Sequence, residues 1–168
     1  MGVAERKIKI VVFGAYNAGK SSFIRALDPF SRHIEAETAD GSTTVAMDFG
    51  RTRVGEHAVF LFGTPGQDRF EFARQILARG MDGAVVVVDS TRDMDDLTLS
   101  LFSWLRSRNI PVAVMANKCD SREAVPDRVR TKAPGFPVHN VSARTGMNVE
   151  ASLRSFVGEI LSARVPVP

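Results

Sequence analysis

The chain has 168 residues, of which 44% are hydrophobic and 24% are charged, and its formal net charge at pH 7 is +3. This length predicts one domain with a substantial core, spanning residues 1–168 with a short flexible tail at 164–168. The lysines and arginines are scattered without a basic block, which argues against nucleic-acid binding. Cys119 is the one cysteine, so an intrachain disulfide is excluded and we expect a cytoplasmic protein.

Targeting signals are not evident in the sequence. No apolar stretch is long enough to span a bilayer, and the N-terminal residues lack the apolar core of a signal peptide. Arg6 stands where a myristoylation signal has Ser or Thr, and the last five residues contain no prenylatable cysteine. We therefore expect no direct lipid anchor, and we expect a monomer.

Apolar runs alternate with helical patterns along the chain, which predicts an α/β fold with a mostly parallel sheet and helices on both faces. Strands are expected at residues 8–13, 44–54, 58–62, 84–88, 111–116 and 138–141. Helices are expected at 20–28, 67–78, 94–107, within 121–131 and at 148–162. The short turn at 54–58 predicts an antiparallel hairpin. The polar residues 31–42 predict a mobile loop.

The most specific motif, G-x-x-x-x-G-K-S, lies between the first strand and the first helix. It consists of Gly14, Ala15, Tyr16, Asn17, Ala18, Gly19, Lys20 and Ser21, followed by Ser22. This pattern is a phosphate-binding loop, in which the glycines let backbone amides form an anion-binding nest at a helix N-terminus. Lys20 places a cation near the β- and γ-phosphates, and Ser21 offers a hydroxyl to Mg²⁺. The loop therefore predicts a nucleoside triphosphate site.

A second motif follows the strand at 111–116, at the sheet edge where open α/β folds bind ligands. Its residues are Asn117, Lys118, Cys119 and Asp120. Guanine presents two neighbouring N–H donors that one carboxylate can accept, whereas adenine does not, so Asp120 predicts selection of guanine. Asn117 and the aliphatic stem of Lys118 would shape the pocket.

A third short motif, Ser142, Ala143 and Arg144, follows the last expected strand. Its position would let the Ala143 amide donate to the carbonyl oxygen of guanine. We therefore include all three residues in the predicted nucleotide site.

Together these motifs resemble the small GTPases of the Ras/Rab-like superfamily. The form Gly63-Thr64-Pro65-Gly66-Gln67 is similar to that of bacterial and archaeal members. The resemblance implies a phosphate-loop G domain with a six-stranded mixed sheet that has one antiparallel edge strand. It also implies a switch that binds GTP or GDP and slowly hydrolyses GTP with Mg²⁺.

The same resemblance implies roles for residues of two switch segments. Thr44, with Thr43 as the competing candidate, would close over Mg²⁺ and the γ-phosphate, so that Ser21 and Thr44 form the predicted metal site. Gly66 would give its amide to the γ-phosphate, and Gln67 would orient the attacking water. Effectors, an exchange factor and an activating protein would bind the surfaces of residues 38–48 (Thr38 to Asp48) and 63–78 (Gly63 to Ala78).

Three positions depart from the pattern that the resemblance predicts. Gly63 stands where the family has a Mg²⁺-restraining aspartate. Asp89 mimics that residue one strand later, but we expect a structural role for it. We therefore expect weaker Mg²⁺ restraint than in typical members. Tyr16 stands where Ras-like proteins have glycine and would crowd an arginine finger, so we place it with Gln67 and Lys20 among the catalytic candidates. Asn17 resembles the asparagine that contacts K⁺ in potassium-activated GTPases, or it simply suits a tight loop.

Two other functions compete with the switch. One is a GTP-binding docking subunit with little hydrolysis, similar to the β-subunit of the signal-recognition-particle receptor. The other is a phosphate-loop kinase, against which the guanine motif at 117–120 and the lack of an acceptor-binding lid both argue.

Overall fold

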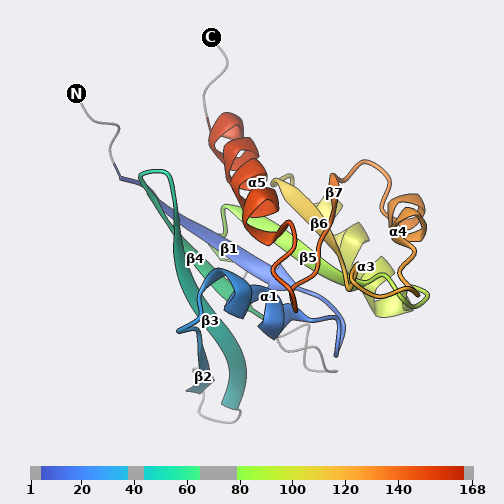
Figure 1. Ribbon diagram of the computed structural model, residues 1–168. Coiled ribbons are helices and arrows are strands. Elements are labelled where there is room, and N and C mark those ends of the chain that lie inside the picture. The colour runs from blue at the N-terminus through green and yellow to red at the C-terminus, as the bar shows by residue number, and fades with distance from the viewer. Residues whose placement is uncertain (1–4, 38–43, 65–78, 165–168) are drawn as a thin grey trace.

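The computed structural model describes residues 5–37, 44–64 and 79–164, with the side chains of 36, 37 and 44–46 left aside. These residues form a seven-stranded sheet with the spatial order β2-β3-β4-β1-β5-β6-β7 (Figure 1). The strands are β1 (Lys7–Phe13), β2 (Arg32–Glu37), β3 (Thr44–Val54), β4 (His57–Gly63), β5 (Gly83–Asp89), β6 (Val112–Asn117) and β7 (Val138–Asn140). The described helices are α1 (Lys20–Leu27), α3 (Asp96–Arg106), α4 (Pro126–Lys132) and α5 (Val149–Ala163).

The expected α/β class and mostly parallel sheet are confirmed. Strand β1 is central and runs parallel to β4 and β5, and the parallel order continues through β6 and β7. The expected hairpin is also present: β3 pairs antiparallel with β4 around a two-residue turn, from Val54 opposite His57. The helix expected at 67–78 falls outside the described residues.

The sequence prediction was wrong about residues 31–42, because six of them, Arg32–Glu37, form β2. This strand pairs antiparallel with β3, so the described residues form seven strands instead of six. Among these strands β3 alone runs against the others, and it lies second from the edge. The side chains of residues 32–35 are exposed. An edge strand of this kind needs no apolar face, since its backbone pairing alone fixes it in the sheet.

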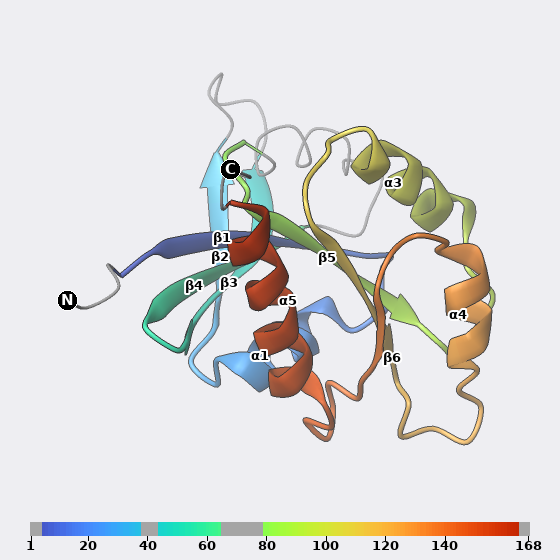
Figure 2. The same ribbon diagram turned by 90° about the horizontal axis from the view of Figure 1, so that it is seen from above.

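The core lies on both faces of the sheet because the central strands alternate their side chains between two helical layers. From β1, Ile10 and Val12 pack with residues of α1 and α5, whereas Val11 and Phe13 pack with residues of α3 and α4. Figure 2 shows α1 and α5 together on one side of the sheet and α3 on the other. No helix among the described residues is both long and apolar enough to cross a membrane.

This arrangement places four loops at one edge of the sheet. The carboxyl ends of β1, β5, β6 and β7 are followed by residues 14–19, 90–95, 118–125 and 141–148. Because parallel strands end together at this edge, motifs that are a hundred residues apart in the sequence become neighbours.

Candidate functional site

The phosphate loop connects β1 directly to α1, and close backbone packing fixes its shape. Gly14 (φ 155°) lies so near β5 that a Cβ there would be 2.5 Å from the Val87 carbonyl oxygen. Gly19 (φ 102°) would bring a Cβ within 2.2 Å of Asn117 Nδ2. Between them Asn17 has a φ of 65°, a left-handed conformation that asparagine tolerates better than most residues. The loop therefore needs its glycines at these two positions.

Lys20 folds back over this loop. Its ammonium donates hydrogen bonds to the carbonyl oxygens of Gly14 (2.7 Å) and Ala15 (3.1 Å). Burial lowers the pKa of Lys20 to about 8, and the negative charge of Asp48 opposes that shift. A polyphosphate bound here would favour the charged form and offset the desolvation. Lys20 is thus positioned for the phosphate contact that the motif predicts.

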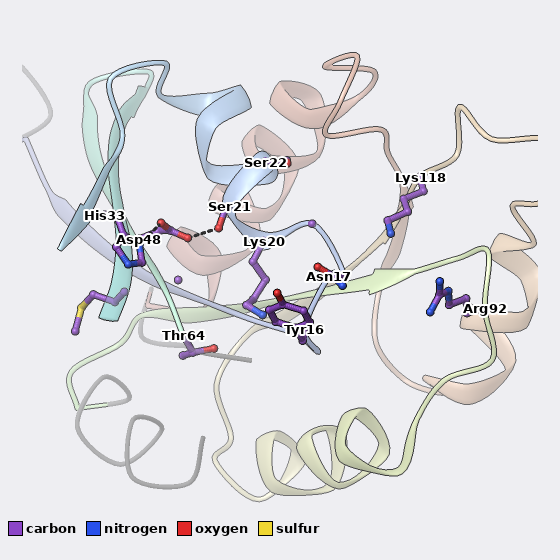
Figure 3. A pocket seen from close by; sticks show the side chains of 13 residues that line it. Tyr16, Asn17, Lys20, Ser21, Ser22, His33, Asp48, Thr64, Arg92 and Lys118 are labelled. Carbon is purple, nitrogen blue, oxygen red and sulfur yellow. Dashed lines mark hydrogen bonds and ion pairs between the residues drawn. The ribbon is translucent and has the colours of Figure 1, made fainter. Parts of the chain in front are cut away.

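A cavity of about 770 Å³ opens beside Lys20. Figure 3 shows its lining side chains, which come from the phosphate loop, from β2, β3 and β4, and from the loops after β5 and β6. The lining residues are Tyr16, Asn17, Gly19, Lys20, Ser21, Ser22, His33, Met47, Asp48, Gly63, Thr64, Arg92 and Lys118. Its size and its lysine and hydroxyl groups suit the phosphate end of a nucleotide.

A second cavity of about 440 Å³ adjoins the first, and the two share Gly19, Ser22 and Lys118 among their lining residues. Its other lining residues are Asn117, Asp120, Ser121, Ala143 and Arg144. The two base-recognition motifs of the sequence therefore meet in one hollow beside the phosphate loop. A ligand with a base at one end and phosphates at the other fits this arrangement.

Asp120 is oriented by the third motif. Its Oδ1 accepts a hydrogen bond from the Ser142 hydroxyl (2.9 Å), and its Oδ2 accepts one from Arg144 Nε (3.1 Å). The Ser142 hydrogen bond, followed by backbone hydrogen bonding and the Arg144 charge, lowers the pKa of Asp120 below its ordinary value. The carboxylate is thus kept ionised, as acceptance of two guanine donors requires.

Asn117 joins three loops from a buried position at the end of β6. Its Nδ2 donates to the Ala18 carbonyl oxygen (2.9 Å), and its Oδ1 accepts from the Ala143 amide (2.9 Å). The amide that we expected to meet the guanine carbonyl oxygen thus donates to Asn117 in this structure. Ser90 adds a hydrogen bond to the Asn117 carbonyl oxygen (2.6 Å). Asn117 therefore fixes the base loops relative to the phosphate loop.

Asp89 is bound within the loops on the base side of the site. It accepts hydrogen bonds from Lys118 Nζ (2.8 Å) and from the amide of Thr91 (2.9 Å). Burial raises the pKa of Asp89, but the hydrogen bonds from Lys118 and Thr91 outweigh it and hold the pKa below its ordinary value. These contacts agree with the structural role expected for Asp89, since they tie the Lys118 side chain to the carboxyl end of β5.

Several predicted switch residues lie outside the described part of the chain. These are Thr43, Gly66 and Gln67, together with residues 38–43 and 65–78 of the two predicted partner surfaces. Thr44 is the first residue of β3, and its side chain is not described. Their predicted roles therefore stay predictions.

The structure adds two residues to the phosphate end that sequence reasoning did not single out. Asp48, on β3, accepts a hydrogen bond from the Ser21 hydroxyl, and His33 Nδ1, on β2, lies 3.1 Å from the other carboxylate oxygen of Asp48. The signal that could have found Asp48 is the hairpin: counting outward from its turn places Asp48 opposite Gly63.

No group of three or more His, Cys, Asp or Glu side chains gathers for a metal ion within residues 5–37, 44–64 and 79–164. Magnesium bound with a nucleotide takes one or two protein oxygens, with phosphates and water supplying the rest. The Ser21 hydroxyl and the Asp48 carboxylate are oxygen donors of this kind.

The phosphate loop after β1 and the paired base loops after β6 and β7 define a phosphate-loop nucleotide-binding domain. Residues 9–118 match the model of the family described as 50S ribosome-binding GTPase. The chain belongs to this GTPase family. The resemblance to small GTPases seen in the sequence is thus confirmed.

Individual relatives agree with this assignment. The uncharacterized protein MJ1339 of Methanocaldococcus jannaschii is 31% identical over 114 residues, which cover 68% of this chain and 71% of that protein. A Ras and EF-hand domain-containing protein homolog of Caenorhabditis elegans is 28% identical over an alignment 179 residues long. The alignment covers 96% of this chain but 27% of that protein.

Solved structures share the fold. Translation elongation factor SelB of Methanococcus maripaludis, in complex with a GTP analogue, superimposes with a TM-score of 0.76 at 18% identity, covering 99% of this chain and 36% of SelB. The G domain of the FeoB iron transporter of T. maritima gives a TM-score of 0.73 at 22% identity, covering 92% of this chain and 99% of that domain. The expected G-domain fold is therefore confirmed.

Proposed function

We propose that the protein is a guanine-nucleotide-dependent switch that binds GTP and GDP and slowly hydrolyses GTP with Mg²⁺. The observation that carries this proposal is the placement of Asp120, which Ser142 and Arg144 orient at the cavity beside the phosphate loop. A carboxylate held in this way accepts the two donors of guanine, and with adenine it would be left without them. Membership of a GTPase family supports the same reaction.

The proposed roles follow the chemistry of phosphoryl transfer, in which positioning and charge stabilisation dominate. Ser21 and Thr44 would hold Mg²⁺, which when bound neutralises charge on the β- and γ-phosphate oxygens. Lys20 supplies a second positive charge near the same oxygens. Gln67 would orient the attacking water, and Gly66 would donate its amide to the γ-phosphate.

Release of the γ-phosphate would change the two switch segments, and proteins that recognise one state would read that change. We place these partners, an effector, an exchange factor and an activating protein, on the surfaces of residues 38–48 and 63–78. The alternative is a docking subunit that keeps its GTP.

One experiment separates these two functions. The nucleotide that copurifies with the protein is identified by chromatography, and hydrolysis of bound GTP is followed in a single turnover without any partner. The switch predicts slow but complete conversion of GTP to GDP, whereas the docking subunit predicts GTP that stays intact. A phosphate-loop kinase would instead prefer adenine nucleotides.

The first prediction concerns Tyr16, a residue that is 68% exposed and lines the phosphate-end cavity. We expect Tyr16→Gly to raise the single-turnover rate of GTP hydrolysis about tenfold, equivalent to about 1.4 kcal/mol of barrier, because removing the ring frees space around the γ-phosphate. Tyr16→Phe keeps the bulk and is expected to leave the rate unchanged. An unchanged rate in Tyr16→Gly would count against the crowding argument.

The second prediction concerns potassium. The left-handed backbone of Asn17 gives a conformational reason for asparagine at this position without any ion. We therefore expect GTP hydrolysis at equal rates in KCl and NaCl of equal ionic strength. A rate at least about tenfold higher in KCl would show a potassium ion lowering the barrier by about 1.4 kcal/mol, and would assign that role to Asn17.

A further inference from the structure

The phosphate end of the site contains a carboxylate, although Gly63 stands where the resemblance to small GTPases implies one. Asp48, on β3, lines the same cavity as Lys20 and Ser21 and is 23% exposed at its side chain. In Figure 3 a dashed line joins Asp48 to Ser21, the residue whose hydroxyl is expected to bind Mg²⁺. The charge that Gly63 cannot supply is therefore present on a different strand.

The sheet explains why this strand can replace the other. Asp48 and Gly63 are directly opposite each other in the antiparallel pair of β3 and β4. Opposite residues project from the same face of a sheet, with their Cβ atoms about 4.5–5.5 Å apart. A carboxylate on either residue can thus reach the same region above the sheet.

The two positions also compete for space. A Cβ added at Gly63 would lie 3.3 Å from Asp48 Cβ and 2.9 Å from Ile24 Cδ1. The absence of a side chain at position 63 therefore leaves room for Asp48, and two carboxylates would crowd each other there. This exclusion makes the glycine and the aspartate one coupled feature of the chain.

The contacts of Asp48 hold its carboxylate toward the phosphate loop. Ser21 donates to Oδ2, and His33, from the edge strand β2, lies 3.1 Å from Oδ1. His33 therefore contacts one oxygen of the Asp48 carboxylate, and the other oxygen is bound by Ser21 at the start of α1. The donors gathered here are a hydroxyl and a carboxylate, which suit Mg²⁺.

We propose that Asp48 takes the place of the missing aspartate at position 63 and, with Ser21, restrains the Mg²⁺ of the bound nucleotide. The inference rests on the proposed guanine-nucleotide function. It changes the expectation of weak Mg²⁺ restraint drawn from Gly63 alone, since the carboxylate has moved to the neighbouring strand.

The test is the dissociation rate of a fluorescent GDP, measured with the full chain in excess Mg²⁺ and again in EDTA. The ratio of the two rates reports how strongly Mg²⁺ holds the nucleotide. We expect EDTA to speed dissociation from the wild type at least tenfold. Asp48→Asn is expected to lose most of that ratio, with little change of the rate in EDTA.

Two further variants distinguish loss of the Asp48 carboxylate from a general loss of folding. Glu35→Gln removes an exposed carboxylate on β2 from the same face of the sheet, and it should keep the wild-type ratio. The exchange Asp48→Gly with Gly63→Asp returns the carboxylate to β4 and should restore the ratio. That exchange removes the contact with Asp48 Cβ, so only the flexible end of Ile24 has to turn away.

The outcomes separate the two proposals. If the wild type binds no fluorescent GDP, the proposed function fails. If EDTA speeds GDP dissociation from the wild type and from Asp48→Asn by the same factor, the role of Asp48 is overturned while the function stands. A ratio near one in the wild type would also overturn the role of Asp48. A lower ratio of the two dissociation rates in Asp48→Asn, together with a restored ratio in the exchange variant, would establish the role of Asp48.

Discussion

Replacing Asp120 with asparagine is expected to weaken GDP binding about a hundredfold to a thousandfold, a loss of roughly 3–4 kcal/mol. The carboxylate can accept both the N1–H and the N2–H of guanine, and charge-assisted hydrogen bonds of this kind are the stronger ones. Asparagine would keep one acceptor and set an N–H donor against a donor of guanine. The loss therefore combines a missing bond with a repulsive contact.

The same substitution is expected to create a preference for xanthine nucleotides. Xanthine carries an oxygen where guanine has its amino group, so an N–H donor at position 120 becomes complementary to it. Binding of GDP and xanthosine diphosphate by calorimetry measures both changes. Asp127→Asn alters an exposed carboxylate, 94% accessible and on α4, and should change neither affinity. Equal GDP affinity in Asp120→Asn and the wild type would remove Asp120 from the site.

Truncating Asn117 to alanine is expected to lower the free energy of unfolding by about 3 kcal/mol and to weaken GDP binding at least about a hundredfold. The side chain is the shared partner of the Ala18 carbonyl oxygen and the Ala143 amide. Removing it leaves a buried donor and a buried acceptor unpaired, each costing about 1–3 kcal/mol. It also frees the base loops from the phosphate loop, so the nucleotide would have to order them.

Urea denaturation and GDP titration measure these two effects. The matched control is Asn140→Ala, which removes an acceptor of one hydrogen bond from Arg130 (2.6 Å) on the exposed side of β7. It should cost about 1 kcal/mol or less and leave GDP affinity unchanged. If Asn117→Ala keeps the wild-type free energy of unfolding, Asn117 does not hold the base loops to the phosphate loop.

Much of the site could be predicted because its motifs are short and local. Residues 14–21 specify a turn and a nest within one segment, and residues 117–120 follow a strand whose apolar run is unmistakable. The rule that parallel strands end together then brings these segments to one edge. The orientation of Asp120 by Ser142 is a further consequence of that edge.

The errors arose where structure depends on distant backbone pairing. Strand β2 is mostly polar, with Ile34 and Ala36 as its two apolar residues, and it takes its conformation from the ladder with β3. The importance of Asp48 depends on register, because only the pairing of β3 with β4 sets it opposite Gly63. The hydrogen bond from the Ala143 amide to Asn117 also depends on tertiary structure, and the contact of this amide with guanine stays a prediction.

The central claim is that this chain binds guanine nucleotides through Asp120 and the phosphate loop. Displacement of fluorescent GDP by GDP, GTP, ADP and ATP in excess Mg²⁺ tests it most directly. We expect GDP and GTP to displace the probe at concentrations at least about a hundredfold lower than ADP and ATP, equivalent to roughly 3 kcal/mol of base selectivity. Displacement by adenine nucleotides at equal concentrations, or no binding of the probe, would contradict the claim.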